Sequence, residues 1–266
     1  MHRDNGSAHV STVDNACVEA GFYELRRAST GPGPDLPDKE TAEAYLSRLE
    51  GATARLLDDI NATGMMPKTD EEVATLITFA GVQAFRGRRH RSHLGATSAQ
   101  FAQEMAETLV AREADKDPAV DPATRDVVAA VRAGAKVTVQ LDQDYEVAQA
   151  LVMGAEDAAQ RLWKMNWCIV AFDKPSILTS DEPVVAWHPS RMPTDVMTAP
   201  NVWLPLGRRH VLEFTETSSD YMTRVGDSVL AQQVNTLVAA QAHMWIVHHP
   251  DDGHLLSGVV PNLLNT

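Results

Sequence analysis

The stretch Asn166-Trp167-Cys168-Ile169-Val170-Ala171-Phe172 marks the point where this chain changes from helical to extended patterning. It is a short apolar run, and Asp173-Lys174-Pro175 ends it with turn-forming residues. A run of this length between such boundaries predicts a buried β-strand. The fold class therefore depends on the patterns that lie on each side of this strand.

On the amino-terminal side, apolar residues recur at three- and four-residue spacing, which is typical of amphipathic helices. Thr69 followed by Glu72 has the spacing of a capping box and predicts the start of one of these helices. We predict about five helices here: from residue 38 to about 60, from 69 onward, and over about 98–114, 121–133 and 145–164.

On the carboxy-terminal side, short apolar stretches predict further strands, and one helical pattern lies among them. The strands are expected over residues 176–179, 184–188, 202–206, 210–215 and 244–248, and the helix over 225–242. Helices first and strands later predict an α+β fold. In it, an amino-terminal helical half packs on a carboxy-terminal, mainly antiparallel sheet with one further helix.

Composition limits the classes of protein and of partner. A chain of 266 residues with 44% hydrophobic content can form a full core, and we predict a single domain over residues 38–266. Residues 1–37 are expected to be poorly ordered or extended, because they are polar and include the proline- and glycine-rich run 30–37. The net charge of −13 disfavours nucleic acid and anionic membranes as partners.

The surroundings of a chain can be inferred from its cysteines and apolar runs, and both indicate the cytoplasm here. No apolar run approaches the roughly 18 residues that span a bilayer, and no secretory signal is visible. Cys17 and Cys168 are far apart and form no CxxC pattern. A reducing, cytoplasmic setting is therefore expected.

The second predicted helix carries polar residues along its apolar face. The stripe of Leu76 and Phe79 continues to Gln83, Arg86 and His90 at three- and four-residue steps. A buried arginine needs a carboxylate or another acceptor, because an unpaired interior charge is costly. The alternative for the histidines and for residues 88–91 is a solvated helix end, where cations suit the helix dipole.

Two acids that could pair with a buried Arg86 lie between two apolar runs. They belong to the stretch Ile177-Leu178-Thr179-Ser180-Asp181-Glu182-Pro183-Val184-Val185. Asp181 and Glu182 are the expected kind of partner for Arg86. As structure, Ser180 or Asp181 accepts backbone hydrogen bonds in a turn. As function, Asp181 presents a carboxylate at a strand end, as a general base, a metal ligand or a clamp for a substrate cation.

Several separated pieces of the sequence match one known family. They are Phe22-Tyr23, Glu50 with Ala52 and Leu56, Gln83-Ala84-Phe85-Arg86, Trp167, Thr179-Ser180-Asp181-Glu182-Pro183, Leu204-Pro205-Leu206 and Asn235. In this order, over about residues 20–250, the chain resembles the bacterial family called domain of unknown function 4238. The resemblance identifies relatives of the chain, but it implies no particular reaction. It implies that Gln83, Arg86, Ser180, Asp181 and Pro183 occupy motif positions of that family.

The chain also departs from the family pattern. Family members usually begin with a His-x-x-Pro segment, and His9-Val10-Ser11-Thr12 has no proline. An inactive or divergent member is therefore one of the expectations.

Two hypotheses of different kinds follow. In the first, the chain is a hydrolase of a small-molecule or anionic substrate, with Asp181 as general base or metal ligand and Arg86 stabilising developing negative charge. Gln83, Ser180, Glu182 and His90 would surround the substrate. In the second, the chain is a non-catalytic binding or partner-regulated protein in which an Arg86–Asp181 pair is structural. No metal is assigned, since the histidines and acids of residues 248–254 match no defined site, and no cofactor is identified.

Overall fold

The computed structural model describes residues 1–2, 7–11, 39–87, 100, 103–104, 108, 125–126, 129–130, 133–135, 154–190, 192, 194–217 and 223–259, with only the backbone of 39–43. The helices are α1 (Lys39–Thr63), α2 (Asp70–Arg86), α6 (Ala155–Lys164), α7 (Ser228–Gln241) and the 3₁₀ helix η3 (Pro250–Gly258). The strands are β1 (Asn166–Ala171), β2 (Thr179–Ser180), β3 (Val185–Trp187), β4 (Asn201–Pro205), β5 (His210–Thr215), β6 (Thr223–Val225) and β7 (Ile246–Val247).

The strands form two sheets. Five of them follow the order β3-β4-β5-β1-β6, and β2 pairs with β7 in a second, two-stranded sheet. All neighbours are antiparallel except β1 and β6, which are parallel. The α+β class is confirmed, with helices before the sheet, and the larger sheet is mixed.

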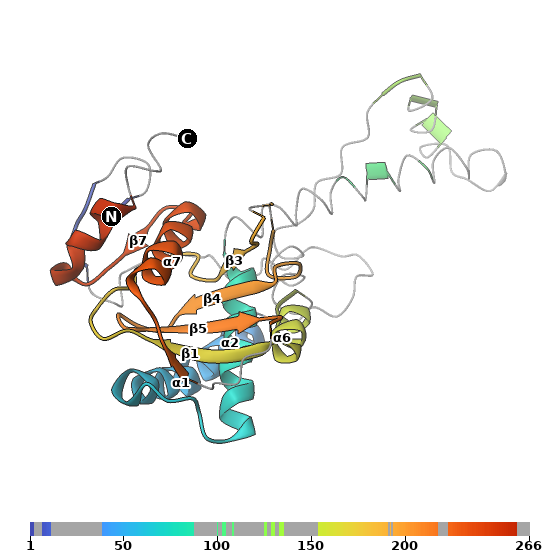
Figure 1. Cartoon of the computed structure of the whole chain (residues 1–266). Coiled ribbons are helices and arrows are strands. Elements are labelled where there is room, and N and C mark those ends of the chain that lie inside the picture. Colours follow the sequence, from blue (N-terminus) through green and yellow to red (C-terminus); the bar gives the residue numbers. More distant parts are fainter. Residues whose placement is uncertain are drawn as a thin grey trace.

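The larger sheet lies between two helical layers (Figure 1). Because side chains alternate along a strand, Ile169 and Leu212 pack with α1, α2 and α6 on one face. Val170 and Val211, their chain neighbours, pack with α7 on the other face. The apolar run that predicted a strand is therefore buried on both sides.

Helices α2 and α6 approach each other closely through small residues. A Cβ at Gly81 would lie 2.5 Å from the carbonyl oxygen of Ala155, so only glycine fits there. The start of α2 is the predicted capping box, in which Thr69 accepts from the Glu72 amide and Glu72 accepts from the Thr69 amide. Local sequence and tertiary packing thus specify the same position for α2.

A buried polar row crosses the sheet and was not predicted. Glu213, on β5, accepts hydrogen bonds from Trp203 Nε1 at 2.9 Å and from the Arg224 guanidinium at 2.9 and 2.8 Å. Cys168 Sγ lies 3.4 Å from the same carboxylate. Burial and the neighbouring Glu213 raise the pKa of the Cys168 thiol to about 11, so the thiol stays protonated and acts as a donor.

Three features of the described residues differ from the sequence prediction. Strand β6 was not predicted, because three residues carry no periodic signal. Helix α2 ends at Arg86, since Gly87 has an extended ψ of 146°, and it does not continue toward His90. Residues 250–258 form η3, a helix that the sequence patterns had not predicted. The helices predicted over 98–114 and 121–133, and the start of that over 145–164, lie mostly outside the described residues.

Two predictions concern the chain as a whole: the absence of a membrane-spanning segment and the division into domains. Among the described helices, none has the length and apolar character needed to cross a bilayer. The division into residues 1–37 and a domain over 38–266 stays a prediction.

His210 is a buried titratable group at the start of β5, with 7% of its surface exposed. Its Nδ1 lies 3.1 Å from Asn61 Oδ1. Asn61 Nδ2 donates to the carbonyls of Leu57 and Leu206, so Oδ1 must accept and His210 Nδ1 must donate. Burial, reinforced by the nearby charge of Arg209, lowers the pKa of His210 below its ordinary value.

We therefore expect stability to fall as the pH drops below about 6.5. In this range the unfolded chain takes up a proton at His210 that the folded chain excludes, so the free energy of unfolding decreases. Urea unfolding from pH 7.5 to 5.0 measures this slope. His210→Gln should flatten it, whereas His254→Gln, at an exposed imidazole, should leave it in place. An unchanged slope in His210→Gln would contradict this assignment.

Candidate functional site

The predicted turn at Ser180–Glu182 follows β2, where Ser180 pairs with Ile246 of β7. Ser180 is buried, and its Oγ accepts the Glu182 amide at 3.2 Å, which closes a serine-type turn. The two acids that follow therefore leave the strand in a fixed direction. This is the structural role that the sequence predicted for Ser180.

The Asp181 carboxylate binds backbone amides. Its Oδ1 accepts from His243 at 3.0 Å, and its Oδ2 accepts from Met244 at 2.8 Å and Trp245 at 3.2 Å. The Asp181 amide in turn donates to the Trp245 carbonyl at 3.1 Å. Asp181 thus fastens the turn after β2 to the segment that connects α7 with β7.

Arg86, the last residue of α2, forms an ion pair with Glu50 of α1. Nη1 lies 2.7 Å from Glu50 Oε1, with 30% and 48% of the two side chains exposed. The predicted ion pair between Arg86 and Asp181 is therefore not formed. Sequence periodicity indicated that Arg86 needs an acid, but the acid comes from the neighbouring helix. Both members of the observed pair belong to the motif pieces that suggested the family.

The end of α2 and the turn are nevertheless neighbours. A Cβ at Gly87 would lie 2.8 Å from Glu182 Cδ, so the Glu182 side chain rests directly on the Gly87 backbone. The two regions that were expected to meet do meet, through Gly87 and Glu182. Any larger residue at position 87 would push the carboxylate aside.

The remaining predicted site residues have different outcomes. Gln83 is half-buried and lies three residues before Arg86 on α2. His90 lies outside the described residues.

Asn235 of α7 positions the strand that leads into the turn. Its Oδ1 accepts from the Leu178 amide at 2.8 Å, and its Nδ2 donates to the Ser176 carbonyl at 2.8 Å. Only 3% of Asn235 is exposed. Sequence reasoning placed Asn235 among the family motifs without giving it a role. The signal was present, since a lone amide in a helical apolar stripe must satisfy its hydrogen bonds.

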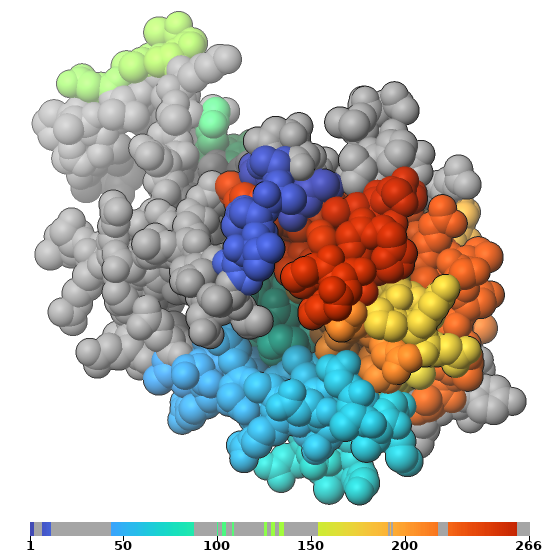
Figure 2. All heavy atoms as spheres, turned by 90° about the vertical axis from the view of Figure 1, so that its left-hand side faces the viewer, coloured from blue at the N-terminus to red at the C-terminus, as the bar shows by residue number. Residues whose placement is uncertain are grey.

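The amino-terminal residues lie against the segment that Asp181 holds. His2 forms an isolated β-bridge with Trp245, and the Ile246 amide donates to the Met1 carbonyl at 2.9 Å. The imidazoles of His2 and His9 contact the Trp245 ring edge-to-face, with centroids 5.0 and 5.1 Å away. Figure 2 shows this blue segment against the red carboxy-terminal residues. No sequence pattern had predicted this contact.

The histidine-rich stretch 248–254 serves the fold through one of its acids. Asp252, in η3, forms a two-point ion pair with Arg208, at 2.7 and 2.9 Å. These hydrogen bonds from Arg208 hold the pKa of Asp252 below its usual value. Across the described residues, no three histidine, cysteine, aspartate or glutamate side chains gather as a metal ion would require.

These contacts define an α+β protein with a polar corner. The corner is assembled from residues 1–2 and 7–11, the Glu50–Arg86 pair, the Ser180–Glu182 turn and residues 243–245. The family model described as "Protein of unknown function (DUF4238)" matches residues 1–252. The chain belongs to this family. The match starts at residue 1 and so includes the amino-terminal segment, which the motif pieces had left out. No curated protein and no solved structure matches the chain.

The amide contacts of Asp181 predict a stability effect. Asp181→Ala should lower the free energy of unfolding by about 2–3 kcal/mol, because three backbone donors lose a charged acceptor. Asp181→Asn should lose less, since its single oxygen at the Oδ2 position still accepts from Met244 and Trp245. Urea unfolding measures the free energy of unfolding of both variants. Asp173→Ala, at an exposed acid, is the control. Full stability in Asp181→Ala would make Asp181 a candidate base again.

Proposed function

We propose that this chain is a hydrolase of a small anionic substrate, with its site at the polar corner where α2 ends beside the Ser180–Glu182 turn. In this proposal Arg86 binds the negative charge of the substrate and Glu182 acts as general base toward water. Asp181 is a positioning residue, because its carboxylate is engaged with backbone amides. Gln83 and Ser180 border the corner.

The observation that carries the proposal is the convergence of motif residues from separate parts of the chain. Glu50 and Arg86 meet in an ion pair, and Glu182 rests on Gly87 directly after Arg86. Two carboxylates and a guanidinium are thus gathered at one corner, with Arg86 and Glu50 partly exposed. Hydrolysis of an ester needs such a set: a base for water, and a cation for the charge that develops on the substrate.

The contacts of the two acids of the turn support different roles for them. Asp181 uses both carboxylate oxygens to accept from three backbone N–H groups, so these oxygens are already engaged in holding the backbone. Glu182 has a side chain longer by one methylene, and it reaches past the turn to the end of α2. In the proposal, Glu182 therefore takes the role of general base that the sequence had suggested for Asp181.

Purified protein should hydrolyse p-nitrophenyl phosphate, bis(p-nitrophenyl) phosphate or p-nitrophenyl acetate, and Glu182→Gln should lower kcat/KM by about 100-fold or more on the substrate that is turned over. Loss of the base explains this decrease. Glu156→Gln, an exposed acid on α6, serves as control. Equal kcat/KM in Glu182→Gln and wild type would exclude Glu182 as base. Absence of turnover on all three esters would favour the second candidate function.

The second candidate function is a non-catalytic binding protein, in which the acids and Arg86 hold the fold together. It is supported by the same contacts: Asp181 joins β2 to residues 243–245, and Arg86 joins α2 to α1. In this case the charges of the corner are neutralised within the protein. Stability, and not turnover, is then the property that the residues serve.

A double-mutant cycle on Glu50→Gln and Arg86→Gln measures how far the pair serves stability. If the pair is structural, we expect a coupling free energy of about 0.2–1 kcal/mol, the range for partly exposed ion pairs. Thermal or urea unfolding of the four proteins gives this value. Additive effects of the two substitutions would show that Arg86 and Glu50 contribute nothing to stability as a pair.

A further inference from the structure

A second polar site lies away from the corner, along α6. A cleft of about 440 Å³ runs between α6, the start of β1 and the loop before β4, with Asp157, Arg161, Lys164, Met165, Met197 and Glu216 among its lining residues. This volume falls within the range of small-molecule sites. Asp157, Arg161 and Lys164 follow each other at four and three residues, so one face of α6 forms the wall.

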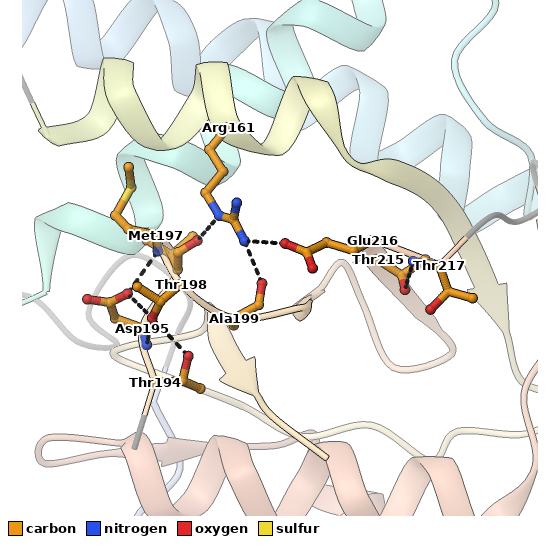
Figure 3. Close-up of polar contacts among 10 residues, drawn as sticks. Arg161, Thr194, Asp195, Met197, Thr198, Ala199, Thr215, Glu216 and Thr217 are labelled. Carbon is orange, nitrogen blue, oxygen red and sulfur yellow. Dashed lines mark hydrogen bonds and ion pairs between the residues drawn. The ribbon is translucent and has the colours of Figure 1, made fainter. Parts of the chain in front are cut away.

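The middle of the cleft is fixed by Arg161. Its Nε donates to the Val196 carbonyl at 3.1 Å, and its Nη2 donates to the Ala199 carbonyl at 2.8 Å and to Glu216 at 3.0 Å. Figure 3 shows the guanidinium reaching from α6 to these groups on the facing wall. Arg161 therefore ties the two walls together and is committed to the protein.

The facing wall is also rigid. Asp195 Oδ1 accepts from the Met197 amide at 3.0 Å and from Thr198 Oγ1 at 2.8 Å. The Ala199 amide donates to the Asp195 carbonyl at 2.9 Å. This turn directs the partly exposed Met197 side chain toward α6 (Figure 3). A wall held in this way is preorganised, so little ordering would oppose binding.

The ends of the cleft carry opposite charges that are not used by the protein. Asp157 and Lys164 are exposed, and across the described residues neither side chain has a hydrogen-bond or ion-pair partner. Arg161, four residues after Asp157, could have paired with it but turns to the other wall. Lys164 follows Asp157 by seven positions, which is a rise of about 10 Å along the helix axis.

From this arrangement we propose that the cleft binds a short zwitterionic peptide of about three residues. Its ammonium group lies at Asp157 and its carboxylate at Lys164, and a side chain between them packs on the partly exposed Met197. Three extended residues span about 10 Å, which matches the rise along α6 from Asp157 to Lys164. Methionine suits variable peptide side chains, because its flexible thioether adapts to different shapes. The cleft shares no residue with the polar corner, so peptide binding here does not depend on hydrolysis there.

Isothermal titration calorimetry of the whole chain with trialanine tests the proposal. We expect saturable binding, weakened about fivefold when the peptide is acetylated at its amino end and about fivefold when its carboxyl end is an amide. Asp157→Asn should weaken trialanine to the same extent and abolish the penalty for acetylation. Lys164→Gln should abolish the penalty for the amide. Each variant thus reports on one end of the peptide.

Asp173→Asn and Lys174→Gln, at an exposed acid and an exposed lysine that follow β1, are the matched controls and should leave all affinities unchanged. Circular dichroism and the melting temperature confirm that the variants remain folded. Absence of saturable heat with millimolar trialanine would overturn the proposal. Equal affinity for the three peptides would overturn it as well, because the end charges would then not be recognised.

Discussion

The compensation of one buried charge determines where the candidate site lies. Glu213 is in the middle strand of the larger sheet, where an unpaired carboxylate would be very costly. Arg224 supplies the counter-charge through two hydrogen bonds, and it belongs to β6, which pairs with β1. The chain then passes within two residues to Asp227, whose side chain caps α7. Helix α7 finally delivers residues 243–245 to Asp181. The position of the turn thus depends on an ion pair that no part of the turn touches.

The two adjacent acids of the turn illustrate how side-chain length decides a role. Backbone N–H groups beyond the end of α7 need acceptors, because the helix no longer supplies them. The short side chain of Asp181 keeps its oxygens close to the backbone, and three such N–H groups converge on it. Glu182 extends further and reaches Gly87 at the end of α2. One acid therefore organises the backbone, whereas its neighbour joins the polar corner.

Much of the fold was predictable because local patterns and burial coincide. The capping box at Thr69, the strand from residue 166 and the strand over 210–215 are all encoded within a few neighbouring residues. β6 was not predictable, since its pairing depends on a distant carboxylate in β5. The partner of Arg86 could not be predicted from the sequence either. The pattern of α2 showed that an acid was needed, but the choice between Glu50 and Asp181 depends on how α1 packs on α2, which no local pattern encodes.

The corner has a further property that follows from its connections. Trp245 donates to the Asp181 carboxylate and accepts from its amide, while its ring contacts His2 and His9. The amino-terminal segment and the end of α2 are thus linked through a single turn: one through Trp245 and Asp181, the other through Glu182. Because hydrogen bonds on adjacent residues constrain the same backbone, a displacement on one side must be accommodated on the other. The amino-terminal segment is therefore part of the architecture of the corner.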